Sequence, residues 1–312
     1  MRVLVTGAAG FIGSNFLRYC LKHSPEWELV GLDDLSTGFM SNVDGLDCSM
    51  TVGSVAEADV VLEAAEGADA IVHLGALGSV PRSVADPVTS HVANLTGTLN
   101  VLEAARINGA YVTFASSSSV YGANGRLPKN EFDWTRPMSP YAVTKLGAEA
   151  YVLAYQHAYA LQTLAFRFFN VYGPRQAAGH AYAAVIPKFL DAAYRSQPLT
   201  VHGDGLQSRD FTFVDTVSGV LHSAVARRLM DPHPVNLAFG TNTNLMQLID
   251  LIKAETGLDV SVQHVESRIG DVRASQADGV RVRELFPEIE PISLETGLER
   301  TVAWFAETFN AS

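Results

Sequence analysis

The segment SPYAVTKLGAEAY (139–151) carries the two side chains most suited to proton chemistry. Tyr141 and Lys145 are four residues apart at the start of a predicted helix, so they would lie one turn apart on the same face. A free phenol has a pKa of about 10, too high for a base near neutral pH. A buried lysine ammonium beside it would favour the phenolate and lower that pKa. The spacing therefore predicts a tyrosine base assisted by Lys145; the alternative is a Tyr/Lys pair on a helix surface.

A glycine-rich loop near the start of the chain indicates a dinucleotide site. In VLVTGAAGFIGSNF (3–16), Gly7, Gly10 and Gly13 lie between the first predicted strand and the first helix. Such glycines permit a tight turn, close approach of a pyrophosphate and close helix–strand packing, while the helix N-terminus, Phe11 and Ile12 here, points its amides at the loop. Asp33 ends the second strand twenty residues beyond Gly13. Its carboxylate suits a ribose diol and would repel a 2′-phosphate, so NAD is favoured over NADP.

The elements that must position these residues alternate along the first half of the chain. The predicted strands are Arg2–Thr6, Glu28–Asp33, Met50–Val52, Ala70–Leu74, Tyr111–Ser116 and Thr163–Phe169, and the predicted helices cover about 11–23, 56–66, 88–108 and 139–160. The strands are apolar throughout, which is typical of strands buried on both faces. Alternation with helices then predicts an α/β fold with a doubly wound parallel sheet of Rossmann type.

The second half has a different pattern. Gly, Pro and His become frequent, and the predicted elements are three short strands and a last helix: Leu199–His202, Val235–Ala238, Val260–Val265 and residues 293–308. No linker rich in Pro, Gly or Ser separates the halves. We therefore predict an NAD-binding domain over residues 1–174 and a smaller, interleaved α/β substrate-binding lobe over residues 175–312.

Composition limits the classes of partner. The 312 residues are 47% hydrophobic and 18% charged, which suits a packed core and rules out a disordered chain. A net charge of −11 argues against nucleic acid and anionic membranes as partners. Cys20 and Cys48 lack metal spacing and are too few for a disulfide framework. No signal peptide or membrane-spanning run is visible, so we expect a cytoplasmic protein. Because neither the cysteines nor the nine histidines show metal spacing, we expect no bound metal.

Several motifs in order resemble one family. The Gly-x-x-Gly-x-x-Gly loop, SSSSVYG, YAVTK and RFFNVYGPR together resemble the extended short-chain dehydrogenase/reductases, and most of all the NAD-dependent nucleotide-sugar epimerases and dehydratases. The resemblance implies a tightly held NAD that removes a hydride from a sugar carbon and later returns it. It also implies that Tyr141 is the base, that Ser117 hydrogen-bonds the reacting sugar oxygen, and that Lys145 also holds the nicotinamide ribose.

Two serines separate the chemistries open to this family. Similar 4,6-dehydratases carry an Asp-Glu pair directly after the catalytic Thr, whereas this chain has Ser118 and Ser119. A serine hydroxyl does not readily act as an acid or base near neutral pH without an activating partner. This favours a UDP-hexose or UDP-N-acetylhexosamine 4-epimerase working through a 4-keto intermediate. A dehydratase that recruits Tyr121 or a thiol remains the alternative, and a non-catalytic NAD-binding regulator a remote one.

The resemblance also implies a substrate site. Asn170 matches a residue that contacts the diphosphate, and Arg209 and Arg268 match two phosphate arginines, whose planar forks suit phosphate oxygens. Arg209 could instead form a structural salt bridge, for it adjoins Asp210. Ser275 matches a wall residue beside the sugar C2 substituent, and its small size permits an N-acetyl group.

The remaining assignments are contacts around the nucleotide base, the sugar and the cofactor. They are Pro187 with Lys188 beside the nucleotide base, Ser79 at the cofactor–sugar boundary, and Leu74 and Asn94 at the cofactor. Three positions depart from the family pattern. Ser54 replaces an Asp that usually holds adenine, and Gly75 and Gly78 leave more room near the nicotinamide.

The resemblance further implies a homodimer, because the helices at about 88–108 and 139–160 pair across a dimer in this family. Two histidines stand out. His73 lies inside an apolar strand, as expected for a hydrogen-bonded core residue, and the loop residue His180 is expected to face solvent.

Overall fold

The computed structural model describes residues 1–179, 183–266 and 273–310. The chain forms two compact units, each assembled from separate segments. Unit 1 comprises Met1–Gly125, Glu131–Phe168 and Val217–Leu237, and unit 2 comprises Arg126–Asn130, Phe169–Thr216 and Ala238–Ser312. Helix α8 (Val214–Arg227) begins in unit 2 and continues into unit 1.

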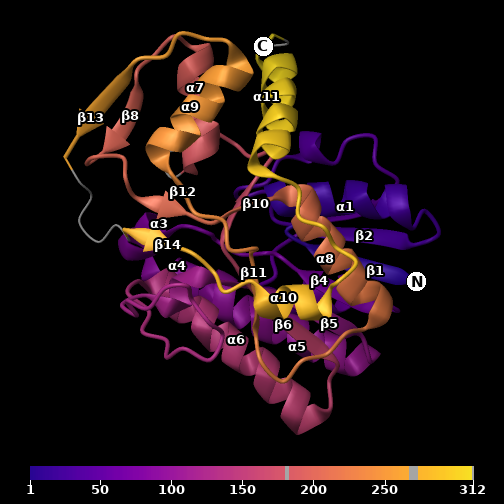
Figure 1. The fold of residues 1–312 in the computed structure, drawn as a ribbon. Helices are drawn as coiled ribbons and strands as arrows, with labels where there is room; N and C mark the ends of the chain where they lie inside the picture. Colours follow the sequence, from indigo (N-terminus) through magenta and orange to yellow (C-terminus); the bar gives the residue numbers. More distant parts are fainter. Residues whose placement is uncertain (180–182, 267–272, 311–312) are drawn as a thin grey trace. The chain divides into compact units, whose positions relative to one another are not determined.

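Unit 1 is built on a seven-stranded parallel sheet with strand order β11-β6-β5-β4-β1-β2-β3 (Figure 1). The strands are β1 Arg2–Thr6, β2 Glu28–Asp33, β3 Ser49–Val52, β4 Ala70–His73, β5 Tyr111–Ser117, β6 Thr163–Phe168 and β11 Val235–Leu237. The strand order reverses between β1 and β4, the switch point at which open α/β sheets bind ligands. The predicted doubly wound parallel sheet is therefore confirmed.

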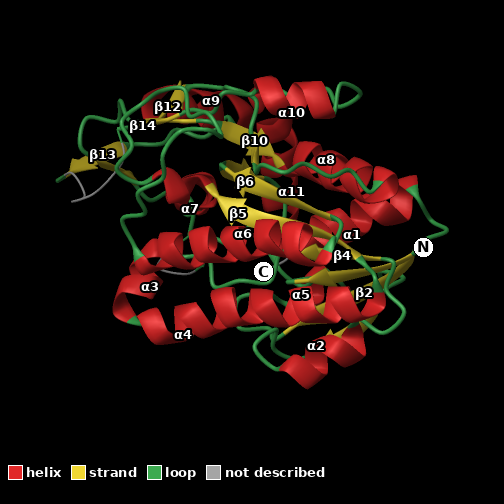
Figure 2. Cartoon of the chain, turned by 90° about the horizontal axis from the view of Figure 1, so that it is seen from below, coloured by secondary structure: helices red, strands yellow, loops and turns green. Residues whose placement is uncertain are grey.

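Helices cover both faces of this sheet (Figure 2). They are α1 Phe11–His23, α2 Ala58–Ala64, α3 Val80–Ala85, α4 Pro87–His91, α5 Gly97–Asn108 and α6 Pro140–Tyr159, with short turns η1 Met40–Asn42 and η3 Ser118–Tyr121. The helix predicted over 88–108 is not one regular helix: a π-helical turn, η2 (Val92–Thr96), separates α4 from α5. Such turns are often found at functional sites.

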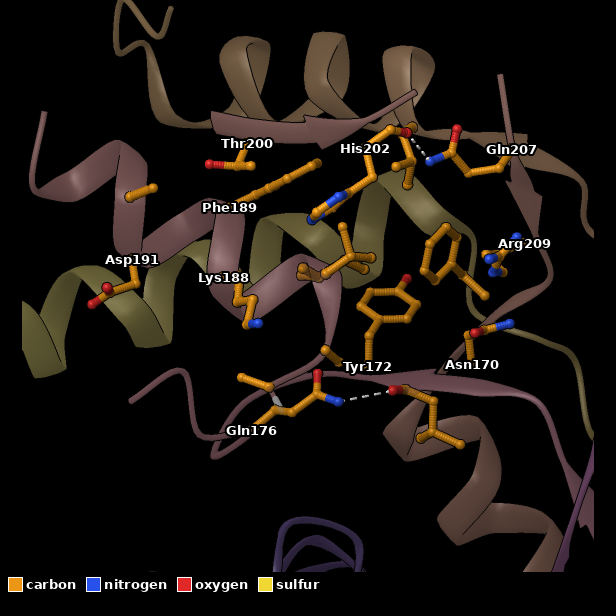
Figure 3. Close-up of a pocket in the computed structure, with 18 of the residues that line it drawn as sticks. Asn170, Tyr172, Gln176, Lys188, Phe189, Asp191, Thr200, His202, Gln207 and Arg209 are labelled. Carbon is orange, nitrogen blue, oxygen red and sulfur yellow. Dashed lines mark hydrogen bonds between the residues drawn. The ribbon is translucent and has the colours of Figure 1, made fainter. Parts of the chain in front are cut away.

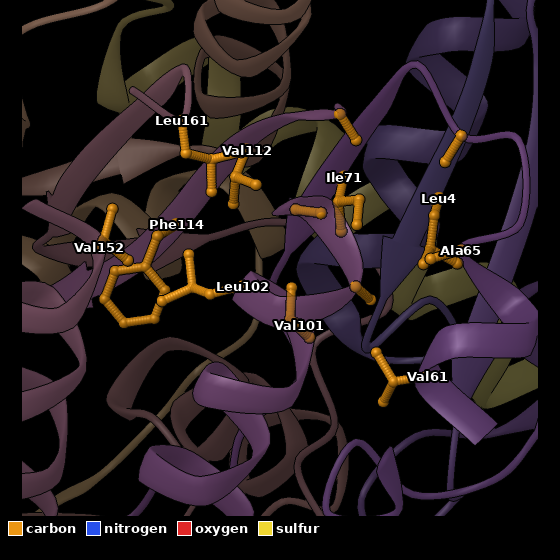
Figure 4. Close-up of a cluster of buried hydrophobic side chains, with 14 of the residues drawn as sticks. Leu4, Val61, Ala65, Ile71, Val101, Leu102, Val112, Phe114, Val152 and Leu161 are labelled. Carbon is orange, nitrogen blue, oxygen red and sulfur yellow. The ribbon is translucent and has the colours of Figure 1, made fainter. Parts of the chain in front are cut away.

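The core of unit 1 lies between the sheet and helices α2, α5 and α6. Figure 4 shows Leu102 of α5 and Val152 of α6 packed against Phe114 of β5, each fully or almost fully buried. On the other face, Trp27 stacks on His222 of α8 with ring centroids 4.6 Å apart. Burial of apolar side chains on both faces explains why these strands show no polar alternation.

The described residues of unit 2 form three small sheets and, besides the start of α8, four helices. The strand pairs are β7 (Asn170–Tyr172) with β10 (Phe211–Phe213) and β8 (Leu199–His202) with β13 (Val262–Val265), and β12 (Thr243–Asn244), β9 (Ser208–Arg209) and β14 (Ala274–Ser275) form the third sheet. The helices are α7 Val185–Tyr194, α9 Leu245–Thr256, α10 Val280–Leu285 and α11 Leu294–Asn310.

One element differs from its predicted place. The strand expected in the second lobe at Val235–Ala238 is β11, which pairs in parallel with β6 at the edge of the unit 1 sheet. Val235 lies opposite Phe166 and Leu237 opposite Phe168. A three-residue apolar strand indicates that it is buried but not which sheet it joins, so its partner was not predictable from its residues.

Candidate active site

The glycine loop is held so closely that larger residues would not fit. Gly7 has φ +70°, a conformation that favours glycine, and a Cβ on it would lie 2.8 Å from the backbone nitrogen of Gly75. A Cβ on Gly13 would lie 2.1 Å from the Gly7 oxygen. Gly10 is the N-cap of α1 and has no side chain to accept from the first helical amides. Those amides, beginning at Phe11 and Ile12, are thus left available to an anion at the helix N-terminus.

Asp33 lies at the end of β2 beside this loop. Its Oδ2 accepts a hydrogen bond from the Ala9 amide at 2.9 Å, and its Oδ1 accepts one from Leu35 at 2.8 Å. Burial raises the pKa of Asp33, and the amide hydrogen bonds oppose that rise. Each carboxylate oxygen has a further lone pair for a ribose hydroxyl. The loop and Asp33 therefore fit the pyrophosphate and adenosine ribose of NAD.

The three departures from the family pattern have different structural roles. Ser54 Oγ accepts from the Ala56 amide at 3.2 Å, so it organises the turn before α2. Gly75 does not leave open space: a Cβ there would lie 3.1 Å from Thr6 Oγ1. Gly78 has no neighbour within 4 Å of such a Cβ. Only Gly78 thus leaves the room that the sequence suggested at both glycines.

Ser117 and Tyr141 are brought together by β5 and α6. Ser117 ends β5 and is the N-cap of η3, where its Oγ accepts from the Ser119 amide at 3.2 Å. The Ser119 hydroxyl lies 2.9 Å from the same Oγ, and Ser117 is close enough to Tyr141 for its side chain to lower the pKa of the phenol. With two Ser119 donors directed at Ser117 Oγ, the Ser117 proton is directed toward Tyr141. Ser119 is therefore a site residue through its contact with Ser117, whereas the sequence indicates only that this position lacks a dehydratase carboxylate.

Lys145 is buried one turn further along α6. Its Nζ donates to the Ala115 carbonyl at 2.8 Å and lies 5.1 Å from the centre of the Phe114 ring. Burial lowers the pKa of Lys145 to about 7. Burial also raises the pKa of Tyr141, and the hydrogen bond with Ser117 opposes that rise. Burial therefore raises the pKa of Tyr141 overall in the protein without its cofactor. That Lys145 and a bound nicotinamide together lower this pKa stays a prediction.

A buried ion pair lies behind the serine strand. Ser116 Oγ donates to Glu149 Oε2 at 2.6 Å, and Arg167 contacts both Glu149 oxygens, at 3.0 and 2.6 Å. Tyr121 is 1% exposed, and its hydroxyl donates to Asn236 Oδ1 at 2.7 Å. Tyr121 is thus engaged in the core, which weakens its candidacy as an acid for dehydration.

The remaining predicted residues of unit 1 are mostly occupied by local hydrogen bonds. Asn94 Oδ1 accepts from the Leu77 amide at 2.7 Å, and its Nδ2 donates to Thr144 Oγ1 at 3.1 Å. Any influence of Asn94 on the cofactor would therefore act through these neighbours. Ser79 is the N-cap of α3, and the Leu74 amide donates to the Thr6 carbonyl at 3.2 Å.

Unit 2 contains a cavity of about 770 Å³ (Figure 3). Its polar and charged wall includes Asn170, Gln176, Lys188, Asp191, Thr200, His202, Gln207 and Arg209. Phe189, Phe211 and Tyr172 add aromatic surface. Pro187 is buried and is not part of the wall, to which α7 contributes Val185, Ile186, Lys188, Phe189, Asp191 and Ala192. A cavity with cations, amides and aromatic rings suits an anionic ligand that carries an aromatic base.

Asp210 assembles the predicted phosphate and sugar residues. Its carboxylate accepts from the amides of Gly240 and Ala277 at 3.0 Å and from Thr241, and its carbonyl accepts from Asn170 Nδ2 at 3.1 Å. On the adjoining strands, Arg209 pairs with Ser275. The structure thus brings Asn170, Arg209 and Ser275 together, while Arg268 and His180 lie outside the described residues.

The features that define an NAD-binding enzyme of the extended short-chain dehydrogenase/reductase class are a parallel sheet with a glycine loop, an acidic β2 terminus, and a Ser/Tyr/Lys set whose lysine is buried. The chain belongs to the NAD dependent epimerase/dehydratase family, whose model matches residues 3–238. NAD is accordingly its cofactor. Among the described residues, no helix combines the length and apolar character needed to cross a bilayer.

Similar proteins carry out more than one reaction. A UDP-glucose 4-epimerase of Mycolicibacterium smegmatis is 35% identical over 98% of both chains. The structure of a UDP-N-acetylglucosamine 4-epimerase from Methanobrevibacter ruminantium has a TM-score of 0.91 at 33% identity, covering 98% of both chains. A dTDP-glucose 4,6-dehydratase from Streptomyces venezuelae has a TM-score of 0.90 at 30% identity, covering all of this chain and 98% of its own. Overall similarity therefore indicates the class of enzyme but does not distinguish epimerase from dehydratase.

Proposed function

We propose that the protein is an NAD-dependent 4-epimerase of a UDP-hexose or UDP-N-acetylhexosamine. The observation that carries this proposal is the serine set at the end of β5. Ser117 interacts with Tyr141 and lowers the pKa of its phenol, while Ser118 and Ser119 occupy the positions at which the resemblance places dehydratase carboxylates. The Ser119 hydroxyl contacts Ser117 and helps to hold its side chain. As a serine, Ser119 provides no carboxyl group for elimination.

In the proposed mechanism, Tyr141 receives the proton of the sugar hydroxyl, and Ser117 hydrogen-bonds the same oxygen. NAD, when bound, supplies the acceptor and later the donor of the hydride, together with a positive charge that favours the phenolate. Before the sugar binds, Ser117 stabilises the phenolate by donating its single proton to Tyr141; with the sugar bound, that proton is donated to the sugar oxygen instead. The two Ser119 donors hold Ser117 Oγ in place in both states. After the keto sugar has rotated to present its other face, the same groups return the proton to its oxygen.

We assign the nucleotide diphosphate to the cavity of unit 2. Lys188 and Arg209 provide positive charge, and Asn170 provides an amide donor for phosphate oxygens. Ser275, which pairs with Arg209, has a small side chain that would permit a C2 substituent such as an N-acetyl group. Arg268, which lies outside the described residues, is proposed as the second phosphate arginine on the resemblance alone.

We also propose a homodimer that uses helices of unit 1. Val84 of α3, Val88 of α4, Val92 of η2, and Val143 and Tyr151 of α6 are exposed, Val88 to 71%. These elements adjoin one another in Figure 2. A set of large apolar side chains on neighbouring helices is typical of a subunit interface. Light scattering on the purified protein measures the assembly directly.

The test of function is incubation with UDP-N-acetylglucosamine and with UDP-glucose, followed by mass spectrometry and proton NMR of the sugar. We expect an isomer of unchanged mass, inverted at C4. A product lighter by one water would instead establish the second candidate, a dehydratase, which the similarity to the Streptomyces enzyme favours.

Replacement of Tyr141 checks the assigned base. Tyr141→Phe should lower turnover by roughly 10²-fold or more while the fold and NAD binding are retained. Full turnover in this variant would contradict the assignment. If the protein were an NAD-binding regulator, neither substrate would be converted by the unaltered chain.

A further inference from the structure

His73 is a buried histidine that the proposed chemistry does not use. It ends β4, is 1% exposed, and has a hydrogen-bond partner on each ring nitrogen. Its Nδ1 lies 2.7 Å from Thr6 Oγ1, and its Nε2 lies 3.0 Å from Thr98 Oγ1. Thr6 directly precedes Gly7 of the cofactor loop, and Thr98 lies in α5. The imidazole thus joins the loop to the helical layer beneath it.

The hydrogen-bond pattern determines which nitrogen of His73 carries the proton. Thr98 has one hydroxyl hydrogen, and its Oγ1 lies 2.6 Å from the Asn94 carbonyl, which can only accept. Thr98 therefore accepts from His73, so the proton is on Nε2. Nδ1 then accepts from the Thr6 hydroxyl.

The opposite tautomer would leave a proton without an acceptor. Thr6 Oγ1 already accepts from the Gly75 amide at 3.1 Å. If Nδ1 were protonated, Thr6 would receive two donors and its own hydrogen would have no partner in this arrangement. A buried donor without an acceptor is unfavourable, which supports the Nε2–H form.

The same series of bonds continues to the helix that carries the base. Asn94 Nδ2 donates to Thr144 Oγ1 at 3.1 Å, and the Thr144 hydroxyl donates to the Tyr141 carbonyl at 2.8 Å. All donors run in one direction, from Gly75 through His73 to the backbone carbonyl of Asn94, and then from the side chain of Asn94 to Tyr141. Such a series has a single consistent arrangement of protons, and buried networks of this kind fix the groups that they join.

We propose that His73, as a neutral imidazole protonated on Nε2, is a positioning residue that holds the cofactor loop and the start of α6 in one fixed arrangement. The inference rests on the proposed function in so far as it takes Tyr141 as the base. His73 itself contacts neither the reacting atoms nor Tyr141; it acts through Thr6 on one side and through Thr98 and Asn94 on the other.

The charge near His73 agrees with a neutral ring. Burial and, to a smaller extent, the charge of Lys145 together lower the pKa of His73 to about 3. A protonated ring would therefore face a neighbouring cation in a site without water-accessible surface. His73 would keep the same protonation state throughout the pH range in which the enzyme is handled.

The first test is NMR on the full-length holoenzyme with ¹⁵N-labelled histidine. The chain has nine histidines, and a spectrum of His73→Gln assigns the signals of the ring. We expect Nε2 to be of the protonated type and Nδ1 of the unprotonated type, without change from about pH 5 to about pH 9. The reverse tautomer, or a titration within that range, would overturn the proposal. This result does not depend on which sugar is converted.

The second test separates positioning from a purely structural role. His73→Gln should lower kcat by about tenfold with little change in the KM of the nucleotide sugar, because a small displacement of a base affects turnover more than binding. The acid limb of the pH–kcat profile should move to higher pH as the phenolate loses its fixed environment. A lower melting temperature with an unmoved profile and unchanged kcat would show that His73 is only structural.

Threonine variants provide a matched control. Thr98→Val removes the acceptor of His73 Nε2–H and should change the profile in the same direction as His73→Gln. Thr113, also buried and on the neighbouring strand β5, has an Oγ1 without a hydrogen-bond partner among the described residues. Thr113→Val should leave kcat and the profile unchanged, and equal effects of the two valine variants would contradict the proposal. If Tyr141→Phe retained turnover, the base would be reassigned, but the NMR result on His73 would stand.

Discussion

The two units hold their functional residues in different ways. In unit 1, Ser117 and the cofactor loop lie at the ends of long parallel strands whose backbones are bonded on both sides. In unit 2, Arg209 and Ser275 lie on strands of two residues each. The short strands depend on one buried carboxylate, Asp210, which accepts from backbone amides at Gly240, Thr241 and Ala277. In unit 1 many backbone hydrogen bonds of the sheet hold the functional residues in place, whereas in unit 2 this depends on the contacts of one side chain, Asp210.

The largest expected effect tests that concentration. Asp210→Ala leaves one buried and two part-buried amides without their acceptor, so the free energy of unfolding should fall by roughly 4 kcal/mol. Urea denaturation measures it, and hydrogen exchange should accelerate at Gly240 and Thr241 but not in β1 and β5. Asp191→Ala is the control, since its exposed pair with Arg195 contributes about 0.5 kcal/mol or less. A loss no greater than that of the control would remove the contrast between the units.

The same contrast explains which parts of the fold the sequence predicted. Strands Arg2–Thr6 and Glu28–Asp33 and helix Phe11–His23 have the predicted bounds, because long buried strands and a glycine loop give strong local patterns. Helices α7 and α9 were not predicted. The residues around them are rich in Gly, Pro and His, and their packing depends on contacts distant in sequence.

The candidate site shows the same limit. The Tyr141/Lys145 spacing and the glycine loop are local motifs, so the sequence proposed their roles. The roles of Asp210 and Ser119 arise from groups that meet only in the folded chain: amides near residues 240 and 277 in one case, and the turn after β5 in the other. A sequence pattern does not record such convergence, and even the neighbouring Arg209–Asp210 pair suggested a salt bridge and not this set of amide contacts.

A second prediction concerns Lys145, which is buried to 4% exposure in unit 1. Its pKa is lowered to about 7 in the folded protein from an ordinary value near 10.5. Between these two pH values the unfolded chain binds more protons, so stability should rise with pH across this window. Lys145→Met removes the penalty and should stabilise the protein by roughly 3 kcal/mol below pH 7, a gain that shrinks toward pH 10.

Thermal unfolding of both proteins over that pH range provides the measurement, and turnover should be lost in the variant. Lys145→Arg, which keeps the charge at every pH, is the matched control and should show no such gain. If Lys145→Met were less stable than the unaltered protein at pH 6, the ammonium would be a net stabilising group. The unit 1 sheet would then rely on a charged side chain as unit 2 does, and the two units would no longer differ in this respect.

The smallest expected effect is chemical and confined to the end of β5. Ser119→Ala removes the hydroxyl that lies 2.9 Å from Ser117 Oγ but retains the Ser119 amide that caps the same oxygen. Because one oriented donor to a catalytic hydroxyl is lost and the strand is unchanged, kcat should fall by about tenfold with stability altered by less than about 0.5 kcal/mol. Ser118→Ala, the neighbouring serine, is the control. Equal losses of kcat in the two variants would show that only the general polarity of the strand end matters. A loss of kcat confined to Ser119→Ala would show that catalysis depends on the orientation of the Ser117 hydroxyl proton, which a rigid sheet can hold fixed.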